Sequence, residues 1–501
     1  MRGRSAVIAL VFVVHGCAAR AVHQQLPAPA STTTVARDAQ EQLARDLDRL
    51  FGSPAYEHAQ WAASVHSLRT GEALYRLHPK RLLLPASAQK LLTAAAAAER
   101  LGWDYRFTTR ILAIGPILDG TLTGDLVVVG NGDPTINPRH PARWRAFDEW
   151  AALLQAKGIT LVTGQLIGDD NAFAEPGWGM GWSWDDLRFG YGAPVGALQY
   201  NENQIELVVA PGLAVGTPGS ITSSPSDSGI FVEHQVTTSA AGSETRVEIA
   251  RVPGTVLLRV QGQIAVDSKP VSVVAAAENP TRLYLNAFRE ALSRHGIFVN
   301  GRTADVDELT TPLKLENATE LHVDRSAPLS EVIDVALKWS RNVYAETLLL
   351  AMAPSGEAAT DTKGLEALRE TLTKWGVAPE SYVPRDGSGL SRYDYVSGEG
   401  LIALLLSVFK NPSHAETFRG TLPVAGLSGT LANRLRGTAA EARVWAKTGS
   451  MSNVRTIAGY LLTLQGEPLV FAVLVNNYRG PSSEIEAIVD KALIRLVEFG
   501  R

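Results

Sequence analysis

The stretch LLLPASAQKLLTAAAAAERLG, residues 82–102, places a serine and a lysine at the start of an otherwise apolar segment. Leucine and alanine would occupy every side of a helix here, a pattern typical of a buried helix, and Pro85 precedes its first turn. Ser87 and Lys90 are three residues apart, so a helix would place them on one face. Because burial disfavours a charged amine, Lys90 could accept the proton of the Ser87 hydroxyl and make it a nucleophile.

A Ser-x-x-Lys pair is a weak signal alone, and a second one occurs at Ser407 and Lys410. There the lysine closes a helix just before Asn411, an exposed position that favours a chance match. The alternative for the first pair is structural: Ser87 would cap the helix and Lys90 would extend its aliphatic chain to solvent.

A second motif lies in KWSRNVYAE, residues 338–346, where Ser340 and Asn342 are two residues apart. On a continuous helix the two side chains would point in different directions. Both can face one site only if this segment is a turn between two helices. The alternative is a simple helix break that Asn342 caps.

The third motif is WAKTGSMSN, residues 445–453, on a predicted strand before a hairpin. Lys447 and Thr448 supply an amine and a hydroxyl that together bind a carboxylate, and Gly449 lets a ligand lie close to the strand edge. An ordinary surface strand end is the alternative. The three motifs occur in order, each in a local context that suits its chemistry.

This set resembles the signature of the penicillin-binding D-alanyl-D-alanine carboxypeptidase/endopeptidases, specifically the low-molecular-mass type with a large insertion. Other similar stretches include LGWDYRFTTR, GNGDPTINP, PRDGSGLSR and LPVAGLSGTL. The resemblance implies an α/β (α+β) fold of the serine β-lactamase/penicillin-binding transpeptidase type, with an antiparallel sheet flanked by helices and split by a large β-rich insertion. That insertion explains the long gap between Ser87 and Ser340.

The resemblance also implies a role for each motif residue. Ser87 would be acylated and Lys90 would be its base, while Ser340 and Asn342 would position the substrate amide and relay a proton to the leaving group. Lys447, Thr448 and Gly449 would bind the D-alanine carboxylate, Lys447 would also keep Lys90 neutral by repulsion, and the backbone N–H groups of Ser87 and Ser450 would form the oxyanion hole.

Three further residues receive narrower expectations. Asp133, in the GDPT stretch, would bind a cationic side chain of the cell-wall peptide, or else open a turn before Pro134. Asp386 is interpreted as a structural turn residue. Arg341 stands in the second motif where the family usually has Asp, and its side chain is expected to point away from the reaction.

The chain is predicted to have four parts. Residues 1–21 read as a signal peptide, with an apolar run between Arg4 and Cys17. Cys17 is placed as in a lipoprotein cleavage box and would tether the protein to a membrane; ordinary cleavage after Ala18 or Ala21 would discard it. The other parts are a flexible lead-in over 22–39, a catalytic domain over 40–104 and 311–501, and an inserted region of two subdomains over 105–310.

Bulk composition excludes several classes of function. The 501 residues carry a formal net charge of −4 and no basic stripe, which disfavours a nucleic-acid partner. No His-Glu-x-x-His occurs, so no catalytic metal is expected, and no cofactor is expected either. The predicted location is periplasmic or otherwise extracytoplasmic.

Three functions are compared. The first is a serine D-Ala-D-Ala carboxypeptidase/endopeptidase that acts on peptidoglycan stem peptides or cross-links and is inhibited by β-lactams. The second is a β-lactamase, which the missing Glu-x-x-Leu-Asn loop between the second and third motifs disfavours. The third is a non-catalytic β-lactam- or wall-binding module, which would be expected to lack a catalytic residue. The balance of the two peptidase activities and the oligomeric state stay open.

Overall fold

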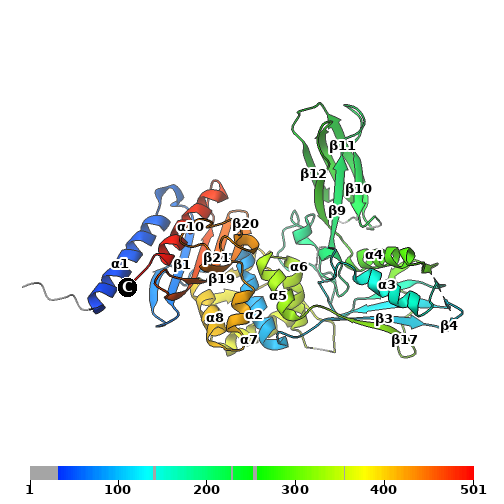
Figure 1. The fold of residues 1–501 in the computed structure, drawn as a ribbon, viewed down its shortest axis with the longest axis horizontal. Coiled ribbons are helices and arrows are strands. Elements are labelled where there is room, and N and C mark those ends of the chain that lie inside the picture. Colours follow the sequence, from blue (N-terminus) through cyan, green and yellow to red (C-terminus); the bar gives the residue numbers. More distant parts are fainter. Residues whose placement is uncertain (1–31, 139–142, 227–228, 252–254, 256, 355) are drawn as a thin grey trace, which may run out of the picture.

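The computed structural model describes residues 32–138, 143–226, 229–251, 255, 257–354 and 356–501. Figure 1 shows two parts: one carries the first helix and the C-terminus, and the other consists of the middle of the chain. The predicted signal segment, with Cys17, lies outside the described residues. Within the described ranges, no helix combines the length and apolar character that a membrane span requires.

A five-stranded antiparallel sheet forms the centre of the first part, with strand order β2-β1-β22-β21-β20. In that order the strands are Ala73–Leu77, Gln60–Ser67, Pro468–Asn476, Val454–Leu462 and Val444–Met451. Two hairpins, β1–β2 and β21–β22, belong to this sheet, and their turns use Gly71 and Gly466 at positive φ. The two chain ends thus build one sheet, as expected.

Helices cover both faces of this sheet (Figure 1). One face packs against α1 (Thr32–Phe51) and α10 (Ser482–Val497). The other face packs against a group of helices, which are α2 (Gln89–Leu101), α5 (Leu329–Lys338), α6 (Asn342–Ala351), α7 (Asp361–Lys374), α8 (Gly398–Lys410) and α9 (Ala415–Gly420). Because α1 begins at Thr32, the flexible lead-in predicted for 22–39 is wrong over its last eight residues.

Helix α2 is buried on all sides, as its composition predicts. The five alanines of 94–98 are each at most 2% exposed, and their small side chains allow α5, α6 and α7 to pack closely around the helix. A short 3-10 turn, Ala86–Ala88, precedes α2 and is followed directly by its first residue, Gln89. Helix α2 therefore holds its first turn rigidly at one end of the catalytic sheet.

The inserted region begins with a second five-stranded sheet, in the order β16-β8-β6-β3-β17. These strands are Thr303–Asp305, Leu166–Asp169, Asp125–Gly130, Thr108–Ile114 and Thr319–Arg325. Helices α3 (Ala146–Ala156) and α4 (Pro280–Arg294) pack on it, and a smaller sheet contains β4 (Ile117–Leu118), β5 (Thr121–Leu122), β7 (Leu161–Val162) and β15 (Phe298–Val299).

The pairing of β17 with β3 corrects one predicted boundary. Residues 311–325 were expected in the catalytic domain, but β17 closes the edge of the inserted sheet, and the catalytic domain resumes only at α5. Two helix-strand segments of similar sequence, residues 149–166 and 287–303, form equivalent units, since β15 pairs in parallel with β7 and β16 with β8.

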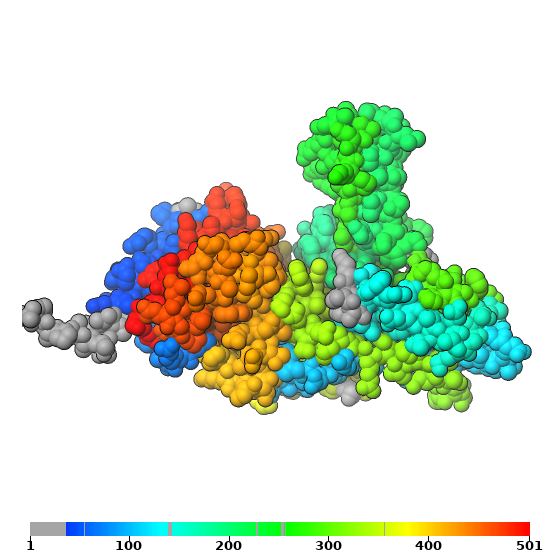
Figure 2. All heavy atoms as spheres, in the orientation of Figure 1, coloured from blue at the N-terminus to red at the C-terminus, as the bar shows by residue number. Residues whose placement is uncertain are grey.

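The rest of the insertion is a β-rich unit that stands out from the body of the molecule (Figures 1 and 2). It has two three-stranded sheets around one small core. Its strands are β9 (Gln204–Ala210), β10 (Ser220–Ser224), β11 (Phe231–Ser239), β12 (Arg246–Arg251), β13 (Leu257–Ala265) and β14 (Val271–Ala276). The insertion thus has separate cores for its two subdomains.

The inserted and catalytic parts meet at a small apolar cluster. It combines Phe173, Val195 and Ala197 from the insertion with Val343 and Leu350 of α6. Backbone hydrogen bonds join the same region, because residue 359 exchanges them with 172 and 174. Helix α6, which begins at Asn342, is therefore fixed from both sides.

Candidate active site

Ser87 and Lys90 meet at the start of the buried helix. Ser87 lies in the 3-10 turn and Lys90 in the first turn of α2, and Lys90 Nζ is 2.9 Å from Ser87 Oγ. Lys90 is 1% exposed, so its amine does not reach solvent. The structural alternative, a lysine whose amine extends to water, is wrong.

Two further acceptors surround the Lys90 amine. The Asn342 Oδ1 atom is 2.6 Å from Nζ and the carbonyl oxygen of Ser388 is 2.7 Å from it. The Asn342 amide is oriented by its own Nδ2, which donates to the carbonyl oxygen of Tyr191 at 2.8 Å. Both acceptors lack a proton to give, so a neutral amine donates its two N–H groups to them. Its lone pair is then left for the Ser87 hydroxyl.

Burial governs the protonation of this amine. It lowers the pKa of Lys90 to about 8, while the charges of Asp386, Glu346 and Asp394 oppose the change. Burial, and then the charge of Lys90, lowers the pKa of Lys447 well below its usual value. The repulsion between the two lysines therefore acts on the pKa of Lys447, and not on that of Lys90 as expected. About one Lys90 in ten is neutral at pH 7 with such a pKa.

Ser340 lies in a turn between α5 and α6, as the second motif predicts. Its φ of 59° is in the left-handed region, which a serine adopts at some cost. The result is that Ser340 Oγ accepts a hydrogen bond from Lys447 Nζ at 2.8 Å while Asn342 contacts Lys90. The turn therefore contacts both lysines, Lys447 through Ser340 and Lys90 through Asn342.

Strand β20 is an edge strand and carries the third motif. Thr448 Oγ1 donates to Thr430 Oγ1 at 2.7 Å, and Lys447 Nζ donates to the carbonyl oxygen of Thr448 at 2.6 Å. A Cβ on Gly449 would lie 2.7 Å from the carbonyl oxygen of Pro85 and 2.9 Å from the backbone nitrogen of Ser87. Glycine is therefore required because the strand packs directly on the turn that carries Ser87, a reason the sequence did not indicate.

A cavity of about 260 Å³ opens onto Ser87, Ser340 and Asn342, whereas Lys90, Lys447 and Thr448 are not among its lining residues. Its lining residues are Ser87, Asp186, Tyr191, Ser340, Asn342, Gly389, Leu390, Arg392, Ser450, Met451 and Ser452. Asp186 accepts a hydrogen bond from the Tyr191 hydroxyl at 2.7 Å and lies 3.9 Å from Arg392. Sequence reasoning missed these three residues, because Asp186 and Tyr191 belong to the insertion and no motif links them to Ser87.

Glu346 is another residue that sequence reasoning missed. It is 4% exposed, and its carboxylate accepts hydrogen bonds from the backbone N–H groups of Gly387 and Ser388, each at 2.8 Å. Ser388 in turn offers its carbonyl oxygen to Lys90. Its position in α6, four residues after Asn342, is the one sequence signal that could have identified it.

Asp386 supports the same loop, as its interpretation as a turn residue predicts. It accepts hydrogen bonds from the backbone N–H groups of Gly389 at 2.6 Å and Ser391 at 2.7 Å. Arg341 points away from the cavity, as expected, and lies 3.4 Å from the buried Glu202 carboxylate.

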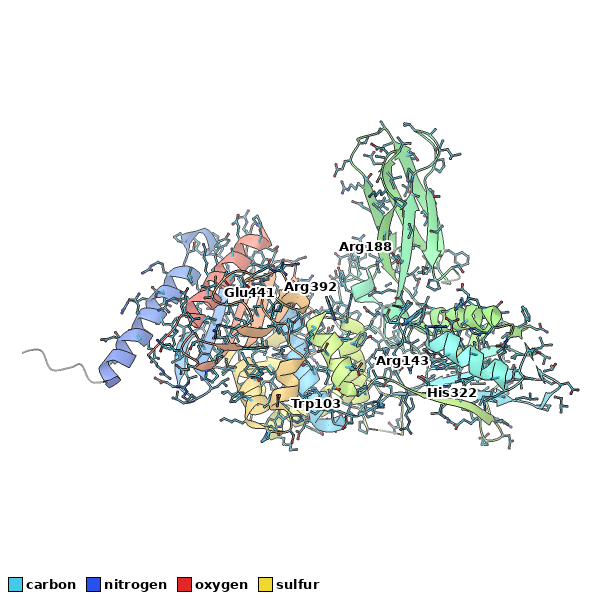
Figure 3. All side chains as sticks on the ribbon, in the orientation of Figure 1. Trp103, Arg143, Arg188, His322, Arg392 and Glu441 are labelled. Carbon is cyan, nitrogen blue, oxygen red and sulfur yellow. The ribbon has the colours of Figure 1, made fainter. Side chains whose placement is uncertain are left out.

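Asp133 is not among the residues that line this cavity either, and its role in binding the substrate stays a prediction. It is buried in the insertion, where it pairs with Arg143 at 3.2 Å and accepts hydrogen bonds from Thr135. Figure 3 places Arg143 with the inserted part and Arg392 beside the catalytic part.

The second Ser-x-x-Lys pair is accidental, as predicted. Ser407 Oγ donates within its own helix to the carbonyl oxygen of Ala403, at 2.9 Å, and Lys410 is the exposed last residue of α8.

Comparison with known proteins now identifies the family. Residues 43–495 match the D-Ala-D-Ala carboxypeptidase 3 (S13) family. The chain belongs to the S13 family. Its serine-type D-Ala-D-Ala carboxypeptidase function, acting on peptidoglycan peptides, agrees with the resemblance seen in the three motifs.

Several S13 relatives are similar over most of their length. The D-alanyl-D-alanine carboxypeptidase of Actinomadura sp. (strain R39) is 35% identical over 91% of this chain and 85% of its own. The D-alanyl-D-alanine carboxypeptidase DacB of Haemophilus influenzae is 29% identical over 84% and 85%. The crystal structure of penicillin binding protein 4 (dacB) from Haemophilus influenzae gives a TM-score of 0.79 at 25% identity, covering 91% of this chain and 99% of that one. The predicted fold class is confirmed.

Proposed function

We propose that this S13 carboxypeptidase forms an acyl-enzyme on Ser87 with Lys90 as the general base. One observation carries the proposal: Lys90 Nζ lies 2.9 Å from Ser87 Oγ, and the two acceptors beside it can take both N–H groups of the neutral amine, which leaves the lone pair for the Ser87 hydroxyl. Ser87 Oγ then attacks the carbonyl carbon between the two D-alanines while Lys90 takes its proton.

The other motif residues provide the groups that this reaction needs. Lys447 and Thr448, side by side on β20, bind the terminal carboxylate. The backbone N–H groups of Ser87 and Ser450, which line the cavity, stabilise the oxyanion. Ser340, hydrogen-bonded to Lys447, passes a proton to the departing amine.

The reaction has two steps, acylation and deacylation of Ser87. In the first, the Ser87 ester forms, the peptide C–N bond breaks, and D-alanine leaves with a proton from Ser340. The proton that Lys90 took from Ser87 replaces the one that Ser340 gave up, so Lys90 is neutral again before the second step. In the second, water attacks the ester with Lys90 again as base, which releases the shortened peptide and restores the Ser87 hydroxyl.

A β-lactam would acylate the same serine. A second crystal structure of the Haemophilus influenzae protein is described as complexed with a novel β-lactam. In this chain the amide bond of the lactam ring would take the place of the D-Ala-D-Ala bond. Without the Glu-x-x-Leu-Asn loop, we expect the penicilloyl ester to persist rather than turn over as in a β-lactamase.

The proposed location is outside the cytoplasm. The positive start and short apolar run of residues 1–21 support export, and Cys17 would be the point of lipid attachment if a lipoprotein peptidase cleaves before it. Metabolic labelling with a radioactive fatty acid, comparing the wild type with Cys17→Ser, tests the tether: label that survives the substitution excludes it.

Mass mapping of labelled penicillin tests the assignment of the nucleophile. The mature protein is incubated with the label and digested, and we expect one labelled peptide, which contains Ser87. The Ser87→Ala variant should take up no label, whereas Ser407→Ala, a serine of the accidental pair, should label like the wild type. Label at any other serine, or none on folded protein, rejects the proposal.

Replacing Lys90 tests its role as the general base. Lys90→Ala should acylate about 10²–10⁴-fold more slowly, the usual cost of losing a general base. Circular dichroism and the melting temperature check that the variant folds, since Lys90 is buried. Acylation at the wild-type rate would show that another group removes the proton.

A further inference from the structure

Three carboxylates converge in the inserted region, remote in sequence from the catalytic motifs. Asp305 ends β16 and Asp170 directly follows β8, and these two strands pair in parallel, so their carboxyl ends lie together. Glu175 comes from the segment that follows β8. One carboxylate oxygen of each residue lies within 4.8 Å of the other two.

Asp170 is the buried member of this group that lacks a full set of partners. The residue is 4% exposed, and its Oδ2 atom accepts a hydrogen bond from the Thr281 hydroxyl. Its Oδ1 atom is buried and has no hydrogen-bond partner among the described residues. A buried carboxylate oxygen without a partner is costly, which indicates that something else satisfies it.

No cation of the described chain neutralises the three groups. None of the ion pairs involves Asp170, Glu175 or Asp305, and the neighbouring Arg282 and Arg302 both pair with Glu308. The cluster therefore concentrates negative charge in a poorly solvated place.

We propose that Asp170, Glu175 and Asp305 bind one calcium ion. Carboxylate oxygens are the ligands that hard divalent cations prefer, and calcium accepts a flexible set completed by water. The ion would satisfy the orphan Oδ1 atom of Asp170 and offset the charge that no arginine or lysine reaches. The site is structural and separate from the reacting groups.

The position of Glu175 suggests what the ion stabilises. The chain continues from Glu175 to Trp182, whose Nε1 donates to Asp386 at 2.8 Å, and Ser391 Oγ donates to the carbonyl oxygen of Met180 at 2.7 Å. The segment therefore runs from the proposed ion to the loop that holds Lys90. A bound ion would fasten the inserted region to the support of the active site.

Equilibrium dialysis of the full chain against radioactive calcium tests the site after treatment with a chelator. We expect one calcium ion per chain, with a dissociation constant of about 10⁻⁴–10⁻³ M, as in weak extracellular sites. Asp170→Asn and Asp305→Asn should each weaken binding at least tenfold. The control Glu149→Gln removes an exposed carboxylate from α3 and should bind calcium like the wild type.

Melting temperature supplies a second readout. Calcium at about 10 mM should raise the melting temperature of the wild type by roughly 1–4 °C and leave that of Asp170→Asn unchanged. In chelator this variant should melt at or above the wild type, because it removes one repelling charge. Should it fail to fold, Glu175→Gln, at the exposed member, gives the same test.

Binding measurements with calcium and magnesium can overturn the proposal. It fails if the folded wild type binds no calcium at about 10 mM, as it would if a proton rather than an ion neutralised the cluster. It also fails if the three substitutions leave calcium binding unchanged. Magnesium is tested in parallel, and tighter binding of magnesium than of calcium rejects the choice of ion.

Discussion

Lys90 Nζ and the carbonyl oxygen of Ser388 are 2.7 Å apart, although 298 residues separate them in the chain. Ser388 is held at its other side by Glu346, which accepts a hydrogen bond from its backbone N–H. The base of the proposed reaction is thus oriented by a loop that a buried carboxylate fixes from helix α6. The contact with Ser388 therefore fixes the orientation of the Lys90 amine.

The rate of acylation should depend on pH through Lys90. A general base acts when it is deprotonated, so the rate constant kcat/KM for penicillin acylation should rise about tenfold per pH unit below the pKa of Lys90 and level off above about pH 8. Stopped-flow measurements between pH 6 and 9 follow the profile. A rate that is flat, or that falls with rising pH, would contradict the assignment of Lys90 as base.

Glu346→Gln should slow acylation without unfolding the protein. The glutamine amide can accept from only one of the two backbone N–H groups and presents its own N–H₂ to the other, so the loop at Ser388 loses a hydrogen bond. We expect kcat to fall about tenfold, with KM for a D-Ala-D-Ala peptide little changed. Glu366→Gln, an exposed glutamate on α7, is the matched control. Equal activity of both variants would show that Glu346 does not position Lys90.

Gly449→Ala should abolish most acylation. The added Cβ would come within 3 Å of Pro85 and of the Ser87 backbone nitrogen, so the turn that carries the nucleophile must move. A misplaced nucleophile commonly costs about 10²-fold in rate. Gly420→Ala is the control, because a Cβ there meets nothing within 4 Å. Labelling with penicillin measures both variants, and wild-type labelling of Gly449→Ala would refute the close approach.

Asp133→Asn should affect stability rather than substrate binding. The substitution removes one of the two carboxylate partners of the largely buried Arg143, which also pairs with Asp324, and we expect the free energy of unfolding to fall by about 1–3 kcal/mol. Urea denaturation measures this change, and steady-state kinetics measures KM for the peptide. A large increase in KM with unchanged stability would support the substrate-binding role instead.

Local patterns predicted much of the catalytic domain. The alanine-rich run specifies a buried α2, the Ser-x-Asn spacing requires a turn between α5 and α6, and alternating apolar residues mark the hairpins around Gly71 and Gly466. Each of these depends on residues a few positions apart, so the sequence displays it directly. The start of α1 and the end of the insertion were misplaced because helix continuation and strand pairing at β17 depend on partners elsewhere.

Motif chemistry identified Ser87, Lys90, Ser340, Asn342 and Lys447, since reactive side chains at fixed spacing are visible in one dimension. Asp186 and Arg392 were missed because they meet across the two parts of the molecule, and Glu346 because its partners at 387 and 388 are distant in sequence. Only folding shows that Asp133 pairs with Arg143. The sequence alone determined which groups can react. The tertiary structure decided which of them are buried together, because burial and hydrogen-bond direction arise from long-range packing that no local pattern records.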